Sequence, residues 1–349
     1  MATKLSCGDS HIGATALAVY RYGTTSPFVE LLDVSNPLKP NLACTLMPAD
    51  GARILSATKL AFWTGDQLGI ADLSSGSPIT QTARLAATAG TGAVSADGTK
   101  FAYRHWDETG TMTLHLYVGG SDRTLYVQQP LGGHGGPGPS VGPLDELAFS
   151  PDGSLLLDHS MFGTTGFTVF RSDGSIAFHS TTATNGTWSP SGHTLFFLSI
   201  PPAGLSGDLH RLDASGDQIV TTGLHELSWP RMSPDGSAII YNAFDSSLPD
   251  CGGVPHLWRL DLSTGRATQV SKAISSGAFF VQPNLVWSDE QQVGQCGPGG
   301  PTARDGVVLA HDFNTGKDAK VDTTLVVPGI GGPPEAPPST FYLLDAWFA

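Results

Sequence analysis

The stretch Ser150-Pro151-Asp152-Gly153 recurs as Ser233-Pro234-Asp235-Gly236, and this repeat decides the fold. Proline presets φ for a tight turn, aspartate accepts hydrogen bonds from the turn's own backbone, and glycine adopts the left-handed conformation that closes it. Each copy follows a large apolar residue and precedes a β-rich run. A strand is therefore predicted to enter at the serine and another to leave after the glycine. Weaker copies begin at Ser95 and Ser189, and more degenerate ones at Ser56 and Ser288.

A second repeated pattern lies one strand further along the chain. Its clearest copies are Leu260-Asp261-Leu262-Ser263-Thr264-Gly265 and His311-Asp312-Phe313-Asn314-Thr315-Gly316. Val118 and Arg171 replace the aspartate in two degenerate copies. Seven copies spaced roughly 46 residues apart fit seven four-stranded propeller blades. The aspartate position falls at 33, 72, 118, 171, 213, 261 and 312.

The two ends of the chain are predicted to share one blade. The first repeat lacks an inner strand, whereas the C-terminal segment 339–349 follows a Pro/Gly-rich link, 328–338, and has no repeat of its own. Segment 339–349 is therefore expected to complete blade one and to close the ring. No segment shows a sustained helical period. The prediction is an all-β fold, a seven-bladed β-propeller of four-stranded antiparallel blades, as a single domain over residues 1–349.

These repeats resemble the TolB-like, or PD40, β-propeller repeat, a WD40-like pattern. Its hallmark is an apolar-Ser-Pro-Asp-Gly turn followed by a β-run and an Asp-x-x-Thr-Gly turn, and repeats two to seven carry it with varying fidelity. Members of the family act as periplasmic interaction platforms, as propeller lids of serine peptidases and as a few lyases. The resemblance therefore implies a fold and leaves the function open.

Charge and hydropathy exclude several classes of partner. Lys and Arg total 18 against 31 Asp and Glu, which gives a formal net charge of −13. Such an acidic chain argues against nucleic acid and against an anionic membrane surface. No apolar run approaches the roughly 18 residues of a membrane span, so no transmembrane segment is expected. The expected state is a monomer.

The four cysteines form no CxxC pair, which argues against a zinc ribbon. Two disulfides are expected, Cys251–Cys296 between equivalent loops of blades six and seven, and Cys7–Cys44 between the N-terminus and the outer strand of blade one. Free buried thiols are the alternative. The sequence Leu5-Ser6-Cys7-Gly8 also resembles the end of a lipoprotein signal, in which Cys7 would carry a lipid. No signal peptide is visible in this chain, and an exported protein is favoured over a cytosolic one.

Loop lengths differ between the two faces of the predicted propeller. The Ser-Pro-Asp-Gly turns are short, and they define a short-turn face. The long segments all fall on the opposite side, the long-loop face, where binding residues concentrate on a rigid scaffold. Tolerated insertions are the alternative. The long segments are 107–113, 130–143, 201–208, 244–256, 296–306 and 328–338.

One local cluster, Arg104-His105-Trp106-Asp107, ends the second strand of blade three, and His159 lies at the same level of blade four. Arginine can bind a carboxylate bidentately and tryptophan can stack on a sugar ring. A hydrogen-bond network between blades is the alternative. The candidate binding residues on or beside the long-loop face are Arg104, His105, Trp106, Asp107, His134, His159, Asp245, His256, Arg304 and Asp305.

No motif assigns chemistry to these residues. The histidines form no HxH or HExxH pair, and a GxSxG elbow is absent. The prediction therefore names no catalytic residue, no metal ligand and no cofactor. It describes a non-catalytic protein- or peptide-binding platform in the bacterial cell envelope, either periplasmic or secreted. The alternatives are a metal-assisted polysaccharide lyase or hydrolase and a carbohydrate-binding propeller that uses Trp106.

Overall fold

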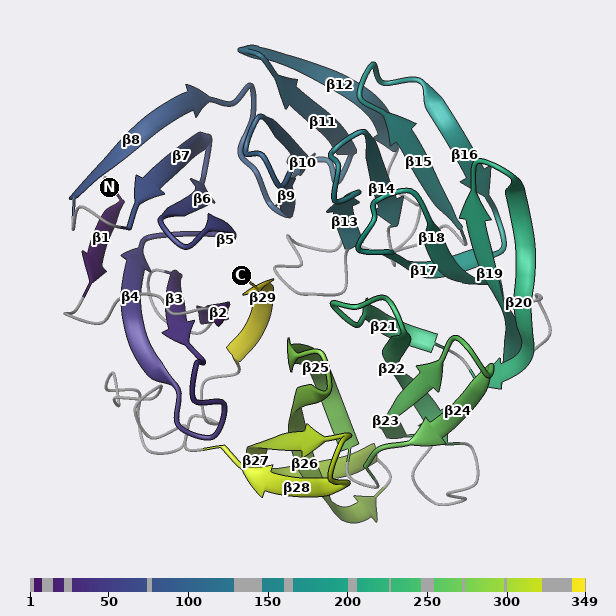
Figure 1. Cartoon of the computed structure of the whole chain (residues 1–349). Coiled ribbons are helices and arrows are strands. Elements are labelled where there is room, and N and C mark those ends of the chain that lie inside the picture. The colour runs from purple at the N-terminus through teal and green to yellow at the C-terminus, as the bar shows by residue number, and fades with distance from the viewer. Residues whose placement is uncertain are drawn as a thin grey trace.

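A computed structural model describes most of the chain, and its sheets form a ring of seven blades around a central axis (Figure 1). The predicted fold class, an all-β seven-bladed propeller, is confirmed. No helix in the described part of the chain could span a membrane. The described residues are 3–7, 15–21, 27–73, 77–128, 146–159, 166–199, 206–225, 227–245, 254–271, 274–297, 300–321 and 341–348.

The blades follow one another along the chain, and each runs from an inner strand to an outer one. Blade one contains β29 (Phe341–Phe348), β2 (Thr15–Arg21), β3 (Phe28–Asp33), β4 (Asn41–Met47) and β1 (Lys4–Cys7). Blade two contains β5 (Gly51–Ser56), β6 (Lys59–Thr64), β7 (Gln67–Asp72) and β8 (Ser77–Arg84), and blade three contains β9 (Gly92–Val94), β10 (Lys100–Trp106), β11 (Met112–Val118) and β12 (Ser121–Gln128). Blade four contains β13 (Glu146–Phe149), β14 (Leu155–His159), β15 (Phe167–Arg171) and β16 (Ile176–Ser180).

The last three blades keep the same order. Blade five contains β17 (Ala183–Trp188), β18 (Leu195–Ser199), β19 (Ser206–Asp213) and β20 (Gly216–His225). Blade six contains β21 (Leu227–Met232), β22 (Ala238–Asp245), β23 (Val254–Asp261) and β24 (Arg266–Gln269). Blade seven contains β25 (Ile274–Gln282), β26 (Leu285–Gly297), β27 (Gly300–Asp312) and β28 (Lys317–Lys320). The third strands of the seven blades end at the seven positions that the aspartate repeat marks.

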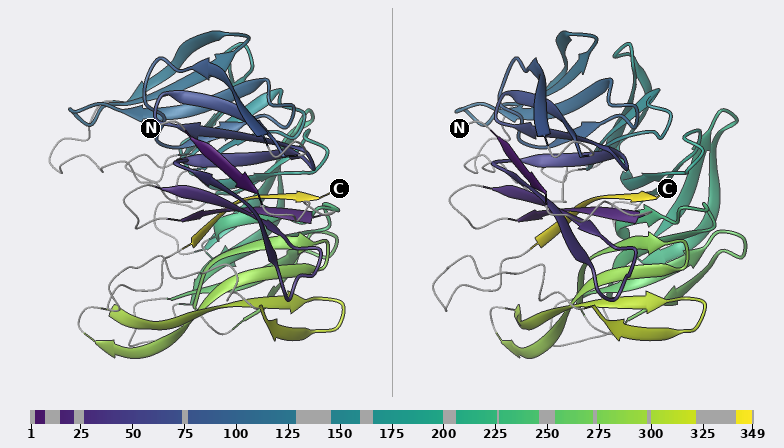
Figure 2. Two further views of the ribbon diagram at one scale, coloured as in Figure 1. Left: turned by 90° about the vertical axis from the view of Figure 1, so that its left-hand side faces the viewer. Right: turned by 60° about the vertical axis from the view of Figure 1, so that its left-hand side comes forward.

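The C-terminal strand closes the ring, as the sequence predicts. β29 pairs antiparallel with β2, from Thr15 opposite Phe348 to Arg21 opposite Phe341. It also contacts β5 and β25, the inner strands of both neighbouring blades. Figure 2 shows the yellow β29 running alongside the purple strands of blade one. Blade one differs from the prediction in one respect, because β1 adds a fifth strand outside β4.

Each Ser-x-Asp-Gly turn satisfies its own polar groups. In blade six the Ser233 hydroxyl donates to Asp235 Oδ1 at 2.6 Å and accepts the Ala238 N–H at 2.9 Å. Asp235 Oδ1 also accepts the Ser237 N–H at 3.0 Å. Gly236 closes the turn with φ of 73°. The Ser233 hydroxyl and the Ser237 N–H lower the pKa of Asp235. The turn aspartate is therefore a structural cap.

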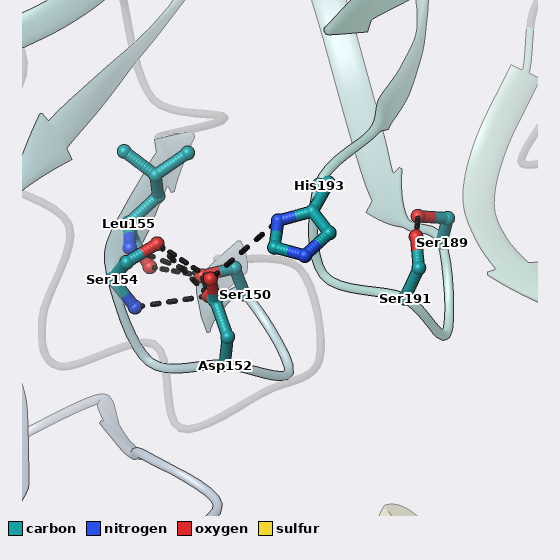
Figure 3. A network of polar contacts seen from close by, with 7 residues as sticks. All are labelled: Ser150, Asp152, Ser154, Leu155, Ser189, Ser191 and His193. Carbon is teal, nitrogen blue, oxygen red and sulfur yellow. Dashed lines mark hydrogen bonds and ion pairs between the residues drawn. The ribbon is translucent and has the colours of Figure 1, made fainter. Parts of the chain in front are cut away.

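These turns also touch one another from blade to blade. A Cβ added to Gly192 of blade five would lie 2.9 Å from the Asp152 backbone nitrogen of blade four. Figure 3 shows the same junction, where His193 Nδ1 lies 3.7 Å from Asp152 Oδ2. Gly236 likewise approaches Pro190 of blade five. The repeated glycine is thus required for its positive φ and for close contact with the preceding blade.

The core lies between the blades. One buried cluster joins Ala102 and Leu114 of blade three to Phe149 and Leu156 of blade four, and other clusters span neighbouring blades in the same way. Large apolar side chains on both faces of each sheet therefore hold the ring together.

Blade seven departs from the repeat that the sequence indicates. Its first turn lies at 283–284, between β25 and β26, and not at Ser288. Ser288 and Trp287 lie inside β26 and pair with both β25 and β27. No glycine follows Ser288 to close a turn, because Asp289 and Glu290 continue the strand. The Trp287 indole is buried and its Nε1–H donates to the Pro37 carbonyl at 3.0 Å.

Candidate functional site

The long-loop face lies at the ends of the second and fourth strands of each blade, because the strands run antiparallel. Its described part is best defined in blades two to four. It includes the turn after β6, the turn after β10 and the residues that precede β5 and β9. Segment 107–113 is described throughout. The loop expected at 296–306 is instead largely strand, because β26 extends to Gly297 and β27 begins at Gly300. Most of the other long segments lie outside the described residues.

Arg104 forms the polar joint between blades three and four. Its Nη2 and Nε atoms donate to Asp158 Oδ1 at 2.5 and 3.1 Å. Both residues lie in second strands, β10 and β14, and the Arg104 side chain is 0% exposed. A fully buried guanidinium presents no surface to a partner. The described contact therefore matches the inter-blade network that the sequence left open as the alternative for Arg104.

The next three residues reach the face itself. His105 Nδ1 lies 3.0 Å from the Thr88 carbonyl oxygen. Trp106 is half-buried against the joint of blades three and four, and its ring covers Gly90 so closely that a Cβ there would lie 2.8 Å away. Asp107 and Glu108 are exposed. Blade three thus presents a half-buried ring beside two carboxylates.

Asp107 organises the turn between β10 and β11. Its Oδ1 accepts the Thr109 hydroxyl at 2.6 Å and the backbone N–H groups of Thr109 and Thr111 at 2.8 and 2.9 Å. The Thr109 hydroxyl is the main cause that lowers the pKa of Asp107. Asp107 is therefore ionised and held in place, whereas the neighbouring Glu108 is exposed.

Asp50, a carboxylate just before β5, is a further polar residue that the sequence does not mark as a candidate. Its Oδ2 accepts the Gly65 N–H at 2.7 Å, which ties the connection between blades one and two to the turn after β6. Burial raises the pKa of Asp50, although hydrogen bonds from Gly65 and Thr64 act in the opposite direction. No repeat or motif surrounds Asp50 in the sequence, so only the fold reveals its burial.

The other candidate residues are not gathered into one described cluster. His256 of β23 is only 3% exposed. His159, Asp245, Arg304 and Asp305 belong to strands β14, β22 and β27, but their side chains lie outside the described part. His134 and Cys251 also lie outside the described residues, so the Cys251–Cys296 pairing stays a prediction.

The predicted Cys7–Cys44 disulfide is present, and it joins β1 to β4. A sulfur in this bond cannot also carry a thioether-linked lipid. The disulfide and the lipid anchor through Cys7 therefore exclude each other, and the structure favours the disulfide.

Histidine–aspartate pairs recur on the outer hairpins of blades three, five and seven. The Nδ1–Oδ1 distance is 3.2 Å between His115 and Asp122 and 2.8 Å between His210 and Asp217. A third pair, His311 and Asp318, also lies at 2.8 Å. These pairs bridge third and fourth strands away from the long-loop face. Within the described ranges, no three His, Cys, Asp or Glu side chains converge as a metal site would require.

Solved structures are similar to this chain at low identity. The tricorn protease matches at 12% identity with a TM-score of 0.54, over 92% of this chain and 35% of that one. An oligogalacturonate lyase in complex with manganese matches at 13% identity with a TM-score of 0.51, over 92% and 96%. TolB from Acinetobacter baumannii matches at 16% identity with a TM-score of 0.47, over 95% and 83%.

The likenesses to the tricorn protease and the oligogalacturonate lyase concern the fold alone. No model of a protein family matches the sequence, and no curated protein matches it. At 12–13% identity, a protease and a lyase share this architecture, so the function has to be argued from the surface.

Proposed function

We propose that the chain is a non-catalytic platform that binds a protein or peptide through its long-loop face, in an extracytoplasmic compartment of a bacterium. The observation that carries the proposal is the difference between the two faces. The polar groups of the short-turn face are hydrogen-bonded within their own turns, and neighbouring turns contact one another. The long segments of the sequence connect strands at the opposite face. Long loops on a rigid scaffold are where proteins place recognition.

The described part of this face suits recognition of a basic partner. The Arg104–Asp158 pair fixes the second strands of two blades beneath it, and Asp107 fixes the turn above. Exposed Glu108 and the net charge of −13 provide a negative field. Such a field accelerates encounter with a positively charged partner and makes binding sensitive to salt.

The Cys7–Cys44 disulfide supports the compartment. Disulfides persist in oxidising environments such as the periplasm and the cell exterior, and are rare in the cytosol.

The test begins with the immobilised protein and a fractionated bacterial envelope extract. The affinity of a captured protein is then measured for the wild type, for Glu108→Lys on the long-loop face and for Ala96→Lys on the short-turn face. Both residues are exposed and flank the same strand, β10. The proposal expects Glu108→Lys to weaken binding roughly tenfold, about 1.4 kcal/mol, and Ala96→Lys to leave it unchanged.

Three outcomes would contradict the proposal. Equal affinities for the three proteins would show that the long-loop face around Glu108 does not contribute to binding. Turnover of a uronate polymer in the presence of manganese would favour the metal-assisted lyase, with His105, His134 and His159 as the residues to mutate. Specific binding of an uncleaved polysaccharide that Trp106→Ala abolishes would favour the carbohydrate-binding propeller.

A further inference from the structure

Blade one ends differently from every other blade, because β1 pairs with its outer strand. Lys4 lies opposite Met47, Leu5 opposite Leu46, Ser6 opposite Thr45 and Cys7 opposite Cys44. In the other six blades the fourth strand is the last one in the described sheets. The outer edge of β4 is therefore a place where an additional strand binds.

The side chains of β1 alternate between exposed and partly buried, as expected for a strand paired at the edge of a sheet. Leu5 and Cys7 are partly buried and pack against the core cluster of blades one and two, whereas Lys4 and Ser6 are exposed. Beyond the strand, the Thr3 hydroxyl donates to the Pro48 carbonyl at 3.0 Å. Below them, Cys44 and Leu46 of β4 are almost fully buried. The edge of β4 thus holds an extended segment in which a leucine lies two positions before a cysteine.

The disulfide is what makes so short a strand stay in place. β1 has four residues, and a short strand gains few hydrogen bonds against the conformational entropy lost on ordering. Cys7 and Cys44 are separated by 37 residues, so their bond removes a large loop-closure entropy from the competing open state. Without the bond, the pairing of β1 with β4 becomes an equilibrium.

We infer that the outer edge of β4 accepts β1 of a second copy of this chain when the Cys7–Cys44 bond is open, and that re-oxidation then links the two copies. A second copy is the expected occupant because its β1 carries the same leucine and cysteine in the same register. Exchange of an identical element is a low-cost route to dimers. The oxidised chain holds its own β1 and stays closed to exchange.

The covalent steps balance with a dithiol reductant and a disulfide oxidant. A thiolate of the reductant attacks a sulfur of the bridge, and its second thiol resolves the mixed disulfide. This releases the Cys7 and Cys44 thiols and leaves the reductant as a disulfide. Re-oxidation removes two electrons and two protons from Cys7 of one copy and Cys44 of the other, and these reduce the added disulfide to two thiols.

Complementary variants test the inference without first reducing a bridge within one chain. A Cys7→Ser copy keeps Cys44, and a Cys44→Ser copy keeps Cys7, so neither can form the bridge within one chain. Mixed in glutathione buffer, the two are expected to give a covalent dimer on non-reducing electrophoresis. Peptide mass spectrometry is expected to identify a Cys7–Cys44 bond between copies. No such dimer in the mixture would overturn the inference.

A matched control separates strand recognition from random thiol encounter. Leu5→Lys in the Cys44→Ser copy keeps the thiol and removes the apolar contact with the core. The yield of dimer is expected to fall at least severalfold. An undiminished yield, or a bond through Cys251 or Cys296, would overturn the inference. If the single variants do not fold, two differently tagged wild-type copies are reduced with dithiothreitol, mixed and re-oxidised, and the absence of a mixed dimer again overturns it.

Discussion

The two faces of this propeller are held together by different chemistry. At the short-turn face, Gly192 and Gly236 press against the turns of the preceding blades, and each turn aspartate is surrounded by donors. At the long-loop face, the described joints depend on single buried polar groups, the Arg104–Asp158 pair and Asp50. The Ser-x-Asp-Gly turns thus form a repeated ring of contacts at the short-turn face, which we call the collar. At the long-loop face, each joint is made by different residues.

This difference appears in the charge states of the carboxylates. Hydrogen bonds lower the pKa of Asp235 in the collar, so its ion is favoured there. Burial raises the pKa of Asp50 at the other face, so its ion is disfavoured. A protein tolerates such costs where the surface serves a purpose other than stability. Four predictions test this contrast.

The largest expected effect comes from breaking the polar joint at the long-loop face. Arg104→Met leaves Asp158 buried without its cation, and should lower the free energy of unfolding by about 3–5 kcal/mol. The double variant Arg104→Met with Asp158→Leu removes both charges and should recover most of that loss. Denaturant midpoints measure both variants. Equal losses in the single and double variants would show that the charge pair is not what joins the blades.

The collar should be less sensitive but still measurable. Gly192→Ala combines a φ of +77° with a contact of 2.9 Å to the Asp152 backbone, and should cost about 1–3 kcal/mol. Gly316→Ala is the matched control, because Gly316 has a φ of +64° with nothing within 4 Å of its added Cβ. It should cost about 1 kcal/mol from backbone strain alone. Thermal unfolding compares them, and equal losses would argue against contact between neighbouring turns.

Replacing the buried Asp50 carboxylate by an amide is expected to stabilise the protein at neutral pH. The folded-state pKa of Asp50 lies above its usual 3.8, so folding favours the protonated form. Its stabilising contribution is present below pH 3.8 and is lost as the pH rises through the raised value. Asp50→Asn keeps an acceptor for the Gly65 N–H, and should raise the melting temperature near pH 7 but not below pH 3.8. Melting curves across this range decide, and a lower melting temperature at pH 7 would contradict the sign.

For Asp235 in the collar, we expect the opposite dependence of stability on pH and the smallest of the four effects. The folded-state pKa of Asp235 lies below 3.8, so its contribution is present above pH 3.8 and is lost as the pH falls through the lowered value. Asp235→Asn should lower the melting temperature near pH 7, and the difference from the wild type should close in acid. Scanning calorimetry at several pH values measures it. A difference that persists unchanged in acid would mean that the ion is not what the turn stabilises.

The collar is the part of the molecule that the sequence predicts well. Its hydrogen bonds run between residues two to five apart, as from Ser233 to Asp235 and Ala238, so a short motif contains the whole turn. Ring closure by β29 was predictable because one repeat lacked a strand and the C-terminus had one left over. The Cys7–Cys44 bond was predicted as the remaining pair once Cys251 and Cys296 were placed in equivalent loops, and it is present.

The long-loop face could not be predicted in the same way. Arg104 and Asp158 are 54 positions apart, and their burial depends on how two blades pack. The sequence therefore indicates Arg104 as a candidate binding residue, whereas in the structure its buried side chain joins two blades. Asp50 carries no motif, and blade seven replaces the usual turn with a shorter one at 283–284. The Arg104–Asp158 pair arises from packing between repeats, which a single repeat does not encode, and the blade-seven turn lacks the Ser-Pro-Asp-Gly pattern that marks the other turns.

Photo-cross-linking from the two ends of β10 can show whether partners bind at the long-loop face. The photoreactive residue p-benzoylphenylalanine replaces Glu108 at one end and Ala96 at the other, both of which are exposed. Each protein is irradiated with the same envelope extract. We expect a discrete cross-linked protein from position 108 and none from position 96. Cross-links from position 96 alone, or the same products from both positions, would contradict it.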